Sequence, residues 1–517
     1  MNDTFRLACA TAILAAPAFA DGHGPFVVNT VQPPSTLDPA FACDIVGNGY
    51  MAPLYAPLVT YGRQSYHGPE GVTVTAENEQ DIIPALAESW SVSDDGLVYM
   101  FTIREGAAFA SGNPIDGAAV AASLARAWQS GACGTYYMEA GNFGNTQSID
   151  AEGNTVTITL AAPEPLLIHA LTQPNLSIVD TAVVEEMGGA GWLATNAAAS
   201  GPYMLESYEP GVQAVFAANP YYFGEAPLEP EVVVNWISDP TALLLQARNG
   251  AADVTLGLPK QMVAELAGEM TVVEVPSPRF MIAALPNKVA PFDNPTFREA
   301  LSYATPYAAI MDSVARGYGE AFFGPFPPHF DAYDAAIGGP RSFNMERAMT
   351  LLAESGVEGP VSLKMVVIEG NAEQDQIATI LQGAWSQLGI VVSVSRLSAA
   401  AYVEVISTPE KTSAILRFDG PSLADPAWLL SYDMRCQSAF NQSNYCNEAA
   451  EGLLNEALAI DNLADRQPLW NRIAEIWVGD APRIPLYADT FTAVLDNDVT
   501  AWDFAQDGPF DLQNWGR

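Results

Sequence analysis

The sequence predicts an α/β protein of two or three lobes, and three observations lead to this prediction. The segment 361–419 alternates strand-like and helix-like patterns. Nearer the N-terminus, the β-rich runs 97–103 and 154–160 lie on either side of a helix-like stretch, 113–128. The chain has 517 residues, which is more than one hydrophobic core usually serves. We therefore expect mixed sheets that are covered by helices.

The first twenty residues have the three parts of a secretory signal peptide. The amino terminus and Arg6 supply positive charge, residues 7–16 are apolar, and residues 18–20 (AFA) form a small-x-small cleavage site. The apolar part is too short to span a bilayer. We therefore expect the signal, residues 1–20, to be removed and the mature chain to begin at Asp21, outside the cytoplasm.

The chain is strongly acidic, with a formal net charge of −39 from 60 Asp and Glu against 21 Lys and Arg. Such a field repels nucleic acid and anionic lipid headgroups, so neither is expected as a partner. Most of this charge is interpreted as an ordinary solvated surface that keeps the protein soluble and plays no part in ligand binding.

Four cysteines follow the predicted cleavage point: Cys43, Cys133, Cys436 and Cys446. An even number in an oxidising compartment favours disulfides, and four cysteines allow three pairings. Cys436 and Cys446 flank the short polar loop QSAFNQSNY, so we expect these two to pair, which leaves Cys43 for Cys133. No CxxC motif is present, so neither redox catalysis nor a structural zinc site is expected.

The clearest pattern is a strand–helix–strand–strand succession in the second half of the chain. VSLKMVVI (361–368) is typical of a buried strand, and AEQDQIATILQGAWSQLG (372–389) carries an apolar helical face. IVVSVSRL (390–397) and TSAILRF (412–418) are predicted as two further strands. Strand–helix–strand spacing of this length implies a right-handed parallel crossover.

Polar residues follow two of these predicted strands at the point where each strand ends. Glu369 follows the first, and the run Arg417, Phe418, Asp419 and Gly420 ends the last. An ordinary strand-to-turn exit would also explain these residue types. Because ligands of open α/β sheets bind just beyond the carboxyl ends of strands, a ligand site is the better interpretation.

No motif in the sequence supports catalysis. The histidines His23, His67, His169 and His329 lie in neither an HExxH nor a GxSxG motif, and both motifs are absent. His169 lies in an apolar helix-like run and is expected to be a hydrogen-bonded core or edge residue. We therefore predict no enzyme activity, no catalytic residue and no cofactor. A secreted enzyme with an unrecognised site is the alternative.

Removal of the signal would leave Asp21-Gly22-His23 at the free N-terminus. An amine, two amide nitrogens and an imidazole at the third position form a square-planar set that suits Cu(II) or Ni(II). A flexible leader that happens to carry His is the better interpretation, because chain termini are usually disordered. No metal site is therefore predicted.

Several phrases of the sequence resemble one protein family along almost the whole mature chain, in the same order. They are LDPAFACDIVGNGYMAPLYAPLVTY (37–61), IIPALAESWSVSDDGLVYMFTIREGAAFASGNPIDGAAVAASLARAW (82–128), SGPYMLESYEPG (200–211), PFDNPTFREALSYAT (291–305) and MERAMTLLAESG (345–356). In these phrases the chain is similar to the extracytoplasmic solute-binding proteins of ABC importers, in the peptide/nickel family that holds the dipeptide and oligopeptide binders.

The resemblance implies a two-lobed periplasmic binding protein with mixed sheets, a hinge of two crossovers and an additional inserted domain. The implied division is a discontinuous domain I (26–50, 200–275 and 486–517), an inserted domain II (51–199) and a domain III (276–485). The lobes would close on a ligand, and a monomer would deliver it to the membrane permease subunits of an ABC importer. The resemblance also supports the Cys436–Cys446 pairing.

The resemblance further implies a role for Asp419, because peptide binders of this family place an Asp after the matching strand to hold the ligand's α-ammonium. Alignment by Asp425-Pro426 would displace this match. Dipeptide binders also place an Arg at the end of the preceding strand to hold the peptide carboxylate, and here Ile368-Glu369 fills that place. We expect Arg417 to share a face with Asp419 and neutralise it, while Phe418 packs on the other face.

These residues predict a ligand with at least one ammonium or guanidinium group, because Glu369 would remain free for a cation. The predicted ligand-binding residues are Arg417, Phe418, Asp419, Gly420 and Glu369. We expect Asp419→Ala to weaken binding by about 2–5 kcal/mol if its carboxylate holds a desolvated charge. An envelope chaperone or docking protein, which would need a broad exposed apolar patch, is the second functional hypothesis.

Overall fold

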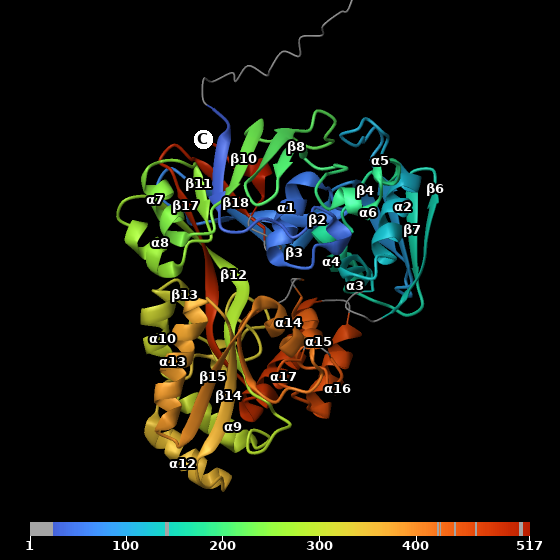
Figure 1. Cartoon of the computed structure of the whole chain (residues 1–517). Helices are drawn as coiled ribbons and strands as arrows, with labels where there is room; N and C mark the ends of the chain where they lie inside the picture. Colours follow the sequence, from blue (N-terminus) through green and yellow to red (C-terminus); the bar gives the residue numbers. More distant parts are fainter. Residues whose placement is uncertain are drawn as a thin grey trace, which may run out of the picture.

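The structure has two lobes that are joined by two long strands. It is a computed structural model that describes residues 24–139, 144–420, 423, 425–438, 441–460, 463–505 and 510–517. The predicted signal peptide and the Asp21-Gly22-His23 motif lie outside the described residues. In Figure 1, β12 (Thr271–Ala284) and β17 (Arg483–Leu495) run from the upper lobe into the lower one.

One sheet, with eleven strands among the described residues, continues through both lobes. In spatial order its strands are β15 (Ile390–Leu397), β14 (Val361–Ile368), β16 (Ala414–Asp419), β12, β17, β11 (Val254–Leu256), β1 (Phe26–Thr30), β10 (Glu231–Trp236), β9 (Gln213–Ala218) and β8 (Tyr203–Glu209). β13 (Gly319–Glu320) pairs with β17 beside this path. β12 and β17, which we call the hinge strands, lie in the middle of this sheet. The strands on one side of them belong to the lower lobe and those on the other side to the upper lobe.

Two smaller sheets lie in the upper lobe. They are β18 (Ala501–Phe504), β3 (Thr73–Pro84) and β2 (Val59–Tyr66) in one, and β4 (Ala87–Val92), β5 (Val98–Ile103), β7 (Thr155–Leu160) and β6 (Thr146–Glu152) in the other. The strands predicted in 97–103 and 154–160 are confirmed as β5 and β7. In β7, Val156, Ile158 and Leu160 are buried and the threonines between them are partly exposed, which is the pattern of a sheet with one face on the core.

Helices pack against the sheets of both lobes (Figure 1). Those of the upper lobe are α1 (Ile45–Leu54), α2 (Gly117–Trp128), α3 (Cys133–Met138), α4 (Leu167–Ala170), α5 (Thr181–Met187), α6 (Ala190–Leu193), α7 (Pro240–Arg248) and α8 (Lys260–Leu266). Those of the lower lobe are α9 (Pro295–Tyr303), α10 (Tyr307–Ile310), α11 (Ala335–Gly338), α12 (Met345–Ser355), α13 (Ala372–Ser386), α14 (Ala399–Ser407), α15 (Pro426–Asp433), α16 (Glu448–Leu458) and α17 (Gln467–Asp480). The helix predicted within 113–128 is confirmed as α2, and Asp116 caps it by accepting the N–H of Ala119.

The predicted strand–helix–strand unit is also confirmed. β14 and β15 pair in parallel over their whole lengths, and α13 connects them. Asn371 starts α13 by accepting the N–H of Gln374. The helix ends at Ser386, earlier than the predicted 389, and a turn that includes Gly389 at φ +76° leads into β15.

β16 leads from this unit to the predicted site. It pairs in parallel with β14 and antiparallel with β12. Asp419 is its last residue and lies opposite Phe280, so the strand ends one residue later than the predicted 412–418. Because β14 and β16 are parallel, their carboxyl ends point toward the same edge of the sheet.

The hinge strands lose their regular pairing as they pass between the lobes. β12 and β17 are antiparallel, but their register shifts between Pro276 and Phe280. Pro276 and Pro278 have no N–H to donate, so neither can complete the ladder here. β12 therefore departs from a regular strand from Ser277 to Arg279, and its register shifts again between Met281 and Ile282.

Both predicted disulfides are confirmed. Cys43–Cys133 joins the segment before α1 to the start of α3, and Cys436–Cys446 closes the loop after α15. The predicted domain boundaries remain a prediction. Two of them, at 275/276 and 485/486, fall inside β12 and β17, the strands that connect the lobes.

Candidate ligand-binding site

A cavity of about 430 Å³ lies between the lobes, a size that suits a small ligand. The upper lobe lines it with residues at the ends of β1 and β11 and with part of α1. The lower lobe contributes β12, the end of β16 and the residue before α13. β1 is parallel to β11, and β14 is parallel to β16. In each lobe the wall therefore includes the carboxyl ends of parallel strands, where such folds bind ligands.

Four phenylalanines make much of this cavity apolar. Phe418 comes from β16, while Phe491, Phe504 and Phe510 come from the C-terminal part of the chain in the upper lobe. The ring centres of Phe491 and Phe504 are 4.7 Å apart. An apolar ligand group placed among these rings would be removed from water, which stabilises a complex by about 25 cal/mol per Å² buried.

Phe418 is held in position by two neighbouring side chains. The guanidinium carbon of Arg279 lies 4.5 Å from the centre of the Phe418 ring. The Tyr487 ring meets it edge-on, with the ring centres 6.0 Å apart. A cation–π contact contributes about 0.5–2 kcal/mol, so both contacts favour one orientation of Phe418 at the cavity wall.

Asp419 lies on the opposite face of β16, inside the lower lobe. Its side chain is fully buried. Its Oδ1 atom is 3.3 Å from Arg417 Nη2 and accepts the N–H of Gly420 at 3.1 Å. Its Oδ2 atom accepts a hydrogen bond from Arg483 Nη1 at 3.1 Å. Both oxygens of this carboxylate are therefore engaged by groups of the protein itself.

Asp433, on α15, joins these residues in a group that we name the Asp419 cluster (Arg417, Asp419, Asp433 and Arg483). Arg483 Nη2 is 2.5 Å from Asp433 Oδ2. Burial raises the pKa of Asp433 from 3.8 to about 7; Arg483 partly offsets this effect and the charge of Asp419 adds to it. Removing one member of a buried ion cluster costs about 3–5 kcal/mol, because the remaining charges stay buried without partners.

Two of the contacts predicted at this strand end are confirmed. Arg417 shares a face with Asp419 and pairs with it, and Phe418 packs on the other face. Direct contact of a ligand with Arg417 or Asp419 remains a prediction. The structure places Phe418, and not the Asp419 carboxylate, in the wall of the described cavity.

Glu369 and Gly420 have surroundings that the sequence did not predict. Glu369 is exposed after β14 and does not line this cavity, whereas Asn371, two residues further on, does. A Cβ atom on Gly420 would lie 2.7 Å from the carbonyl oxygen of Pro278 and 3.0 Å from Cα of Arg279. Glycine is therefore required there for the end of β16 to approach the irregular segment of β12.

Asp425, the alternative match for a ligand-binding carboxylate, is likewise engaged within the protein. Its Oδ1 atom accepts the N–H of Ala427 at 2.6 Å and caps α15. Its Oδ2 atom accepts a hydrogen bond from Arg466 at 2.9 Å, and both side chains are buried. These contacts assign Asp425 to helix capping and to a buried ion pair.

Sequence reasoning missed Arg279 and the three upper-lobe phenylalanines. Phe491 occupies an ordinary strand pattern, and Phe504 and Phe510 belong to no motif. The one available signal was the phrase PSPRF (276–280), in which prolines interrupt a β-rich run just before a cation.

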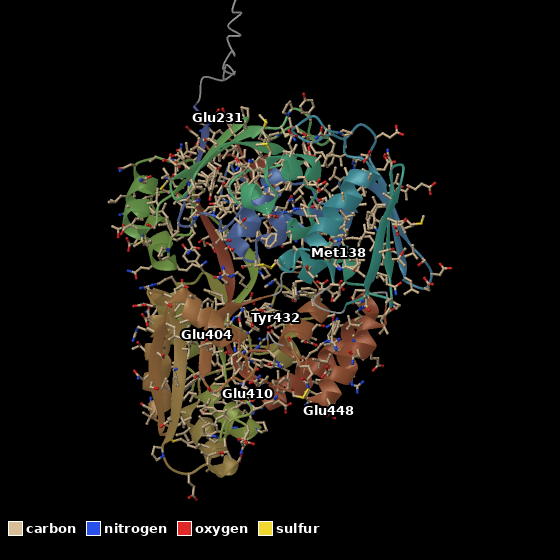
Figure 2. The ribbon with its side chains drawn as sticks, turned by 45° about the vertical axis from the view of Figure 1, so that its right-hand side comes forward. Met138, Glu231, Glu404, Glu410, Tyr432 and Glu448 are labelled. Carbon is tan, nitrogen blue, oxygen red and sulfur yellow. A yellow bond between two sulfur atoms is a disulfide. The ribbon has the colours of Figure 1, made fainter. Side chains whose placement is uncertain are left out.

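The lobes also contact each other beside the cavity, between α3 and α15. The ring of Trp428 stacks on Tyr137 with centres 6.0 Å apart, and meets Tyr136 edge-on at 5.4 Å. Figure 2 labels Met138 at the end of α3 and Tyr432 on α15, on either side of the boundary between the lobes. The structure is thus a form in which the two lobes touch.

Among the described residues, no helix has the length and apolarity to cross a membrane, and no group of three His, Cys, Asp or Glu could hold a metal ion. His169 is buried, and its Nδ1 atom is 3.2 Å from the Tyr61 hydroxyl oxygen, which confirms it as a hydrogen-bonded core residue. Burial also lowers its pKa.

Residues 81–441 match the model of the middle part of family 5 of the bacterial extracellular solute-binding proteins. The chain belongs to this family. It is 29% identical over 488 residues to the probable D,D-dipeptide-binding periplasmic protein DdpA of Escherichia coli K12, and the match covers 92% of this chain and 91% of DdpA.

Solved structures of two-lobed binding proteins share this fold. The periplasmic binding protein DppA from Helicobacter pylori, solved with the peptide STSA, superposes with a TM-score of 0.79 at 22% identity, over 95% of this chain and 98% of DppA. NikA from Brucella suis, solved with Fe(III)-EDTA, gives a TM-score of 0.81 at 21% identity, over 95% of this chain and 99% of NikA. The family and the two-lobed α/β fold predicted from the sequence are confirmed.

Replacement of Asp419 by Asn should lower the free energy of unfolding by about 3–5 kcal/mol, because the buried Arg483 and the half-buried Arg417 would be left with one carboxylate fewer. Urea unfolding of the ligand-free protein measures this loss. Asp375→Asn is the matched control, since its ion pair with Arg396 is partly exposed and such pairs contribute about 1 kcal/mol or less. Equal losses for the two variants would contradict a structural role for Asp419.

Asp433→Asn should change how stability depends on pH. In the folded protein Asp433 keeps its proton up to about pH 7, whereas the ordinary pKa is 3.8, so this group makes the wild type less stable as pH rises from about 4 to 7. The variant should lose less stability over this interval, as measured by urea unfolding at several pH values. Glu164 and Asp511, whose pKa values burial also raises to about 7, are common to both proteins. If the free energy of unfolding fell equally with pH in the two proteins, the raised pKa of Asp433 would be refuted as the cause of this loss.

Proposed function

We propose that this protein is a periplasmic receptor that captures a peptide or peptide-like solute between its lobes and delivers it to the permease subunits of an ABC importer. The cavity between Phe418 and the upper-lobe phenylalanines is the observation that carries this proposal. Membership of a solute-binding family and the peptide-related names of DdpA and DppA support it. In this proposal the protein is a monomer without enzyme activity, and its signal peptide is removed on export.

The fold supplies a physical route to capture. β12 and β17 connect the lobes, and β12 is irregular between Pro276 and Phe280, so a rotation there would disturb few ladder hydrogen bonds. A ligand that contacts both walls of the cavity stabilises the closed form by its extra contacts in that form. Closure would then present to the permease a surface that the open form lacks.

The cationic group predicted for the ligand remains part of this proposal, because a peptide with free ends carries an ammonium as well as a carboxylate. No carboxylate lines the described cavity, so the ammonium would be bound elsewhere in the cleft. The chaperone or docking hypothesis receives less support, since it needs a broad apolar surface and the described phenylalanines line a cavity between the lobes instead.

Addition of a bound peptide should raise the melting temperature, because a ligand that binds only the folded state stabilises it by mass action. A thermal-shift screen of free-acid dipeptides to tetrapeptides, followed by calorimetry, identifies such ligands. Small-angle scattering of the best pair should show a smaller radius of gyration with ligand than without it.

Phe418→Ala should weaken this binding without removing the disulfides or the Asp419 cluster. Exposed Phe343 gives a matched control, and Phe343→Ala should bind as the wild type does. Turnover of a screened compound, with no compound bound intact, would contradict the proposal.

A further inference from the structure

Arg279 is a half-buried arginine in the cavity wall whose guanidinium has no carboxylate partner in the described part of the chain. Its guanidinium contacts the Phe418 ring, but no described Asp or Glu oxygen lies within 4.0 Å of it. Its backbone N–H donates a hydrogen bond to Ser277 Oγ. By contrast, Arg417, Arg466 and Arg483 each pair with an aspartate.

The protein has 60 acidic and 21 basic residues. Other described arginines without an ion pair, such as Arg298 and Arg341, lie outside the described cavity, whereas Arg279 lies in its wall. Carboxylates are abundant, and Figure 2 shows Glu404 and Glu448 among those of the lower lobe, where both are exposed. No acidic residue lines the described cavity. An arginine has five N–H donors and remains ionised, so its unused donors favour an anion in this space.

The backbone around Arg279 restricts where its side chain can go. Pro278 directly precedes Arg279, and Pro276 lies two residues before Pro278. The end of β16 approaches the Arg279 backbone so closely that a Cβ atom on Gly420 would not fit. The Phe418 ring supports one face of the guanidinium. A cation that is already in place loses less conformational entropy when it binds its partner.

Two acidic residues, Glu373 and Asp489, act on Tyr487 together with Arg279, but neither pairs with this arginine. Glu373, on the first turn of α13, interacts with Arg279 at longer range, and burial raises the pKa of Glu373. Asp489 is paired with Lys260 at 3.3 Å. Neither forms an ion pair with Arg279, so its charge is left for a ligand.

We infer that Arg279 is the specificity-determining residue that binds a carboxylate of the ligand, while the four phenylalanines hold an apolar group attached to it. This inference rests on the proposed function and narrows it. The ligand class is an amphipathic carboxylate, such as a peptide with a free carboxyl terminus. Glu369, which was predicted to bind a cation of the ligand, is exposed and lies outside the described cavity. The charged ligand-binding group in this inference is instead Arg279 of β12.

The test compares each free-acid peptide with its C-terminal amide, and N-acetylphenylalanine with its amide, by calorimetry on the full-length mature protein. The wild type should bind the acids more tightly than the amides by about tenfold or more, the effect of removing one charged partner at a partly desolvated site. Arg279→Gln should abolish this preference, and Arg279→Lys should retain part of it. Arg248→Gln is the matched control, because Arg248 is exposed and pairs with Glu269; it should keep the wild-type preference.

Each result distinguishes this inference from the proposed function. Binding of acids and amides with equal affinity by the wild type, or an acid preference that persists in a folded Arg279→Gln protein, would overturn the role of Arg279 and leave the receptor function standing. Binding of N-acetylphenylalanine but of no peptide would remove peptides as the solute class while supporting Arg279. Binding of neither kind of acid would overturn both.

Discussion

The lower lobe depends on the way a buried arginine, Arg483, and a half-buried one, Arg417, are neutralised at the end of β16. Arg417 and Arg483 enter the interior from neighbouring parts of the sheet, and Asp419 lies between them with one oxygen toward each. Buried charges without partners cost several kcal/mol each, so this arrangement constrains the rotamers of all three side chains. Because side chains alternate along a strand, engaging Asp419 on the inner face directs Phe418 toward the space between the lobes.

The same constraint relates the core of the lobe to the hinge. Arg483 is the first residue of β17, and β17 returns to the upper lobe beside β12. Phe418 contacts Arg279 of β12, and Gly420 packs directly against its backbone. The ion cluster, the cavity wall and the irregular segment of the hinge are therefore joined through a few adjacent residues. A ligand at this wall would contact the element whose bending opens and closes the lobes.

Local patterns predicted much of the fold. The strand at 361–368, the helix after it and the parallel strand at 390–397 each have a clear hydrophobic period, and each is formed. The helix α2 was predicted from its pattern and Asp116 serves as its N-cap, and the Cys436–Cys446 disulfide was predicted from the closeness of the two cysteines in sequence. The family resemblance added the two lobes, which no local period encodes.

The site was harder to predict, because burial and pairing are set by residues far apart in the chain. Asp419 was correctly placed at a strand end and beside Arg417, but Arg483 and Asp433 lie 64 and 14 residues away (483 − 419 and 433 − 419). The sequence offered only Arg417 as a partner for Asp419, whereas Arg483 binds its second carboxylate oxygen and Asp433 pairs with Arg483. Arg279 and Phe418 meet only because β12 and β16 are neighbours in the sheet, and the upper-lobe phenylalanines reach the cavity only after the lobes assemble.

The most direct test of this account is a crystal structure of the protein with a bound free-acid peptide. We predict that the peptide carboxylate contacts Arg279, that an apolar group of the peptide contacts Phe418, and that Asp419 keeps its pairs with Arg417 and Arg483. A peptide ammonium bound to the Asp419 carboxylate, with either arginine displaced, would contradict the account.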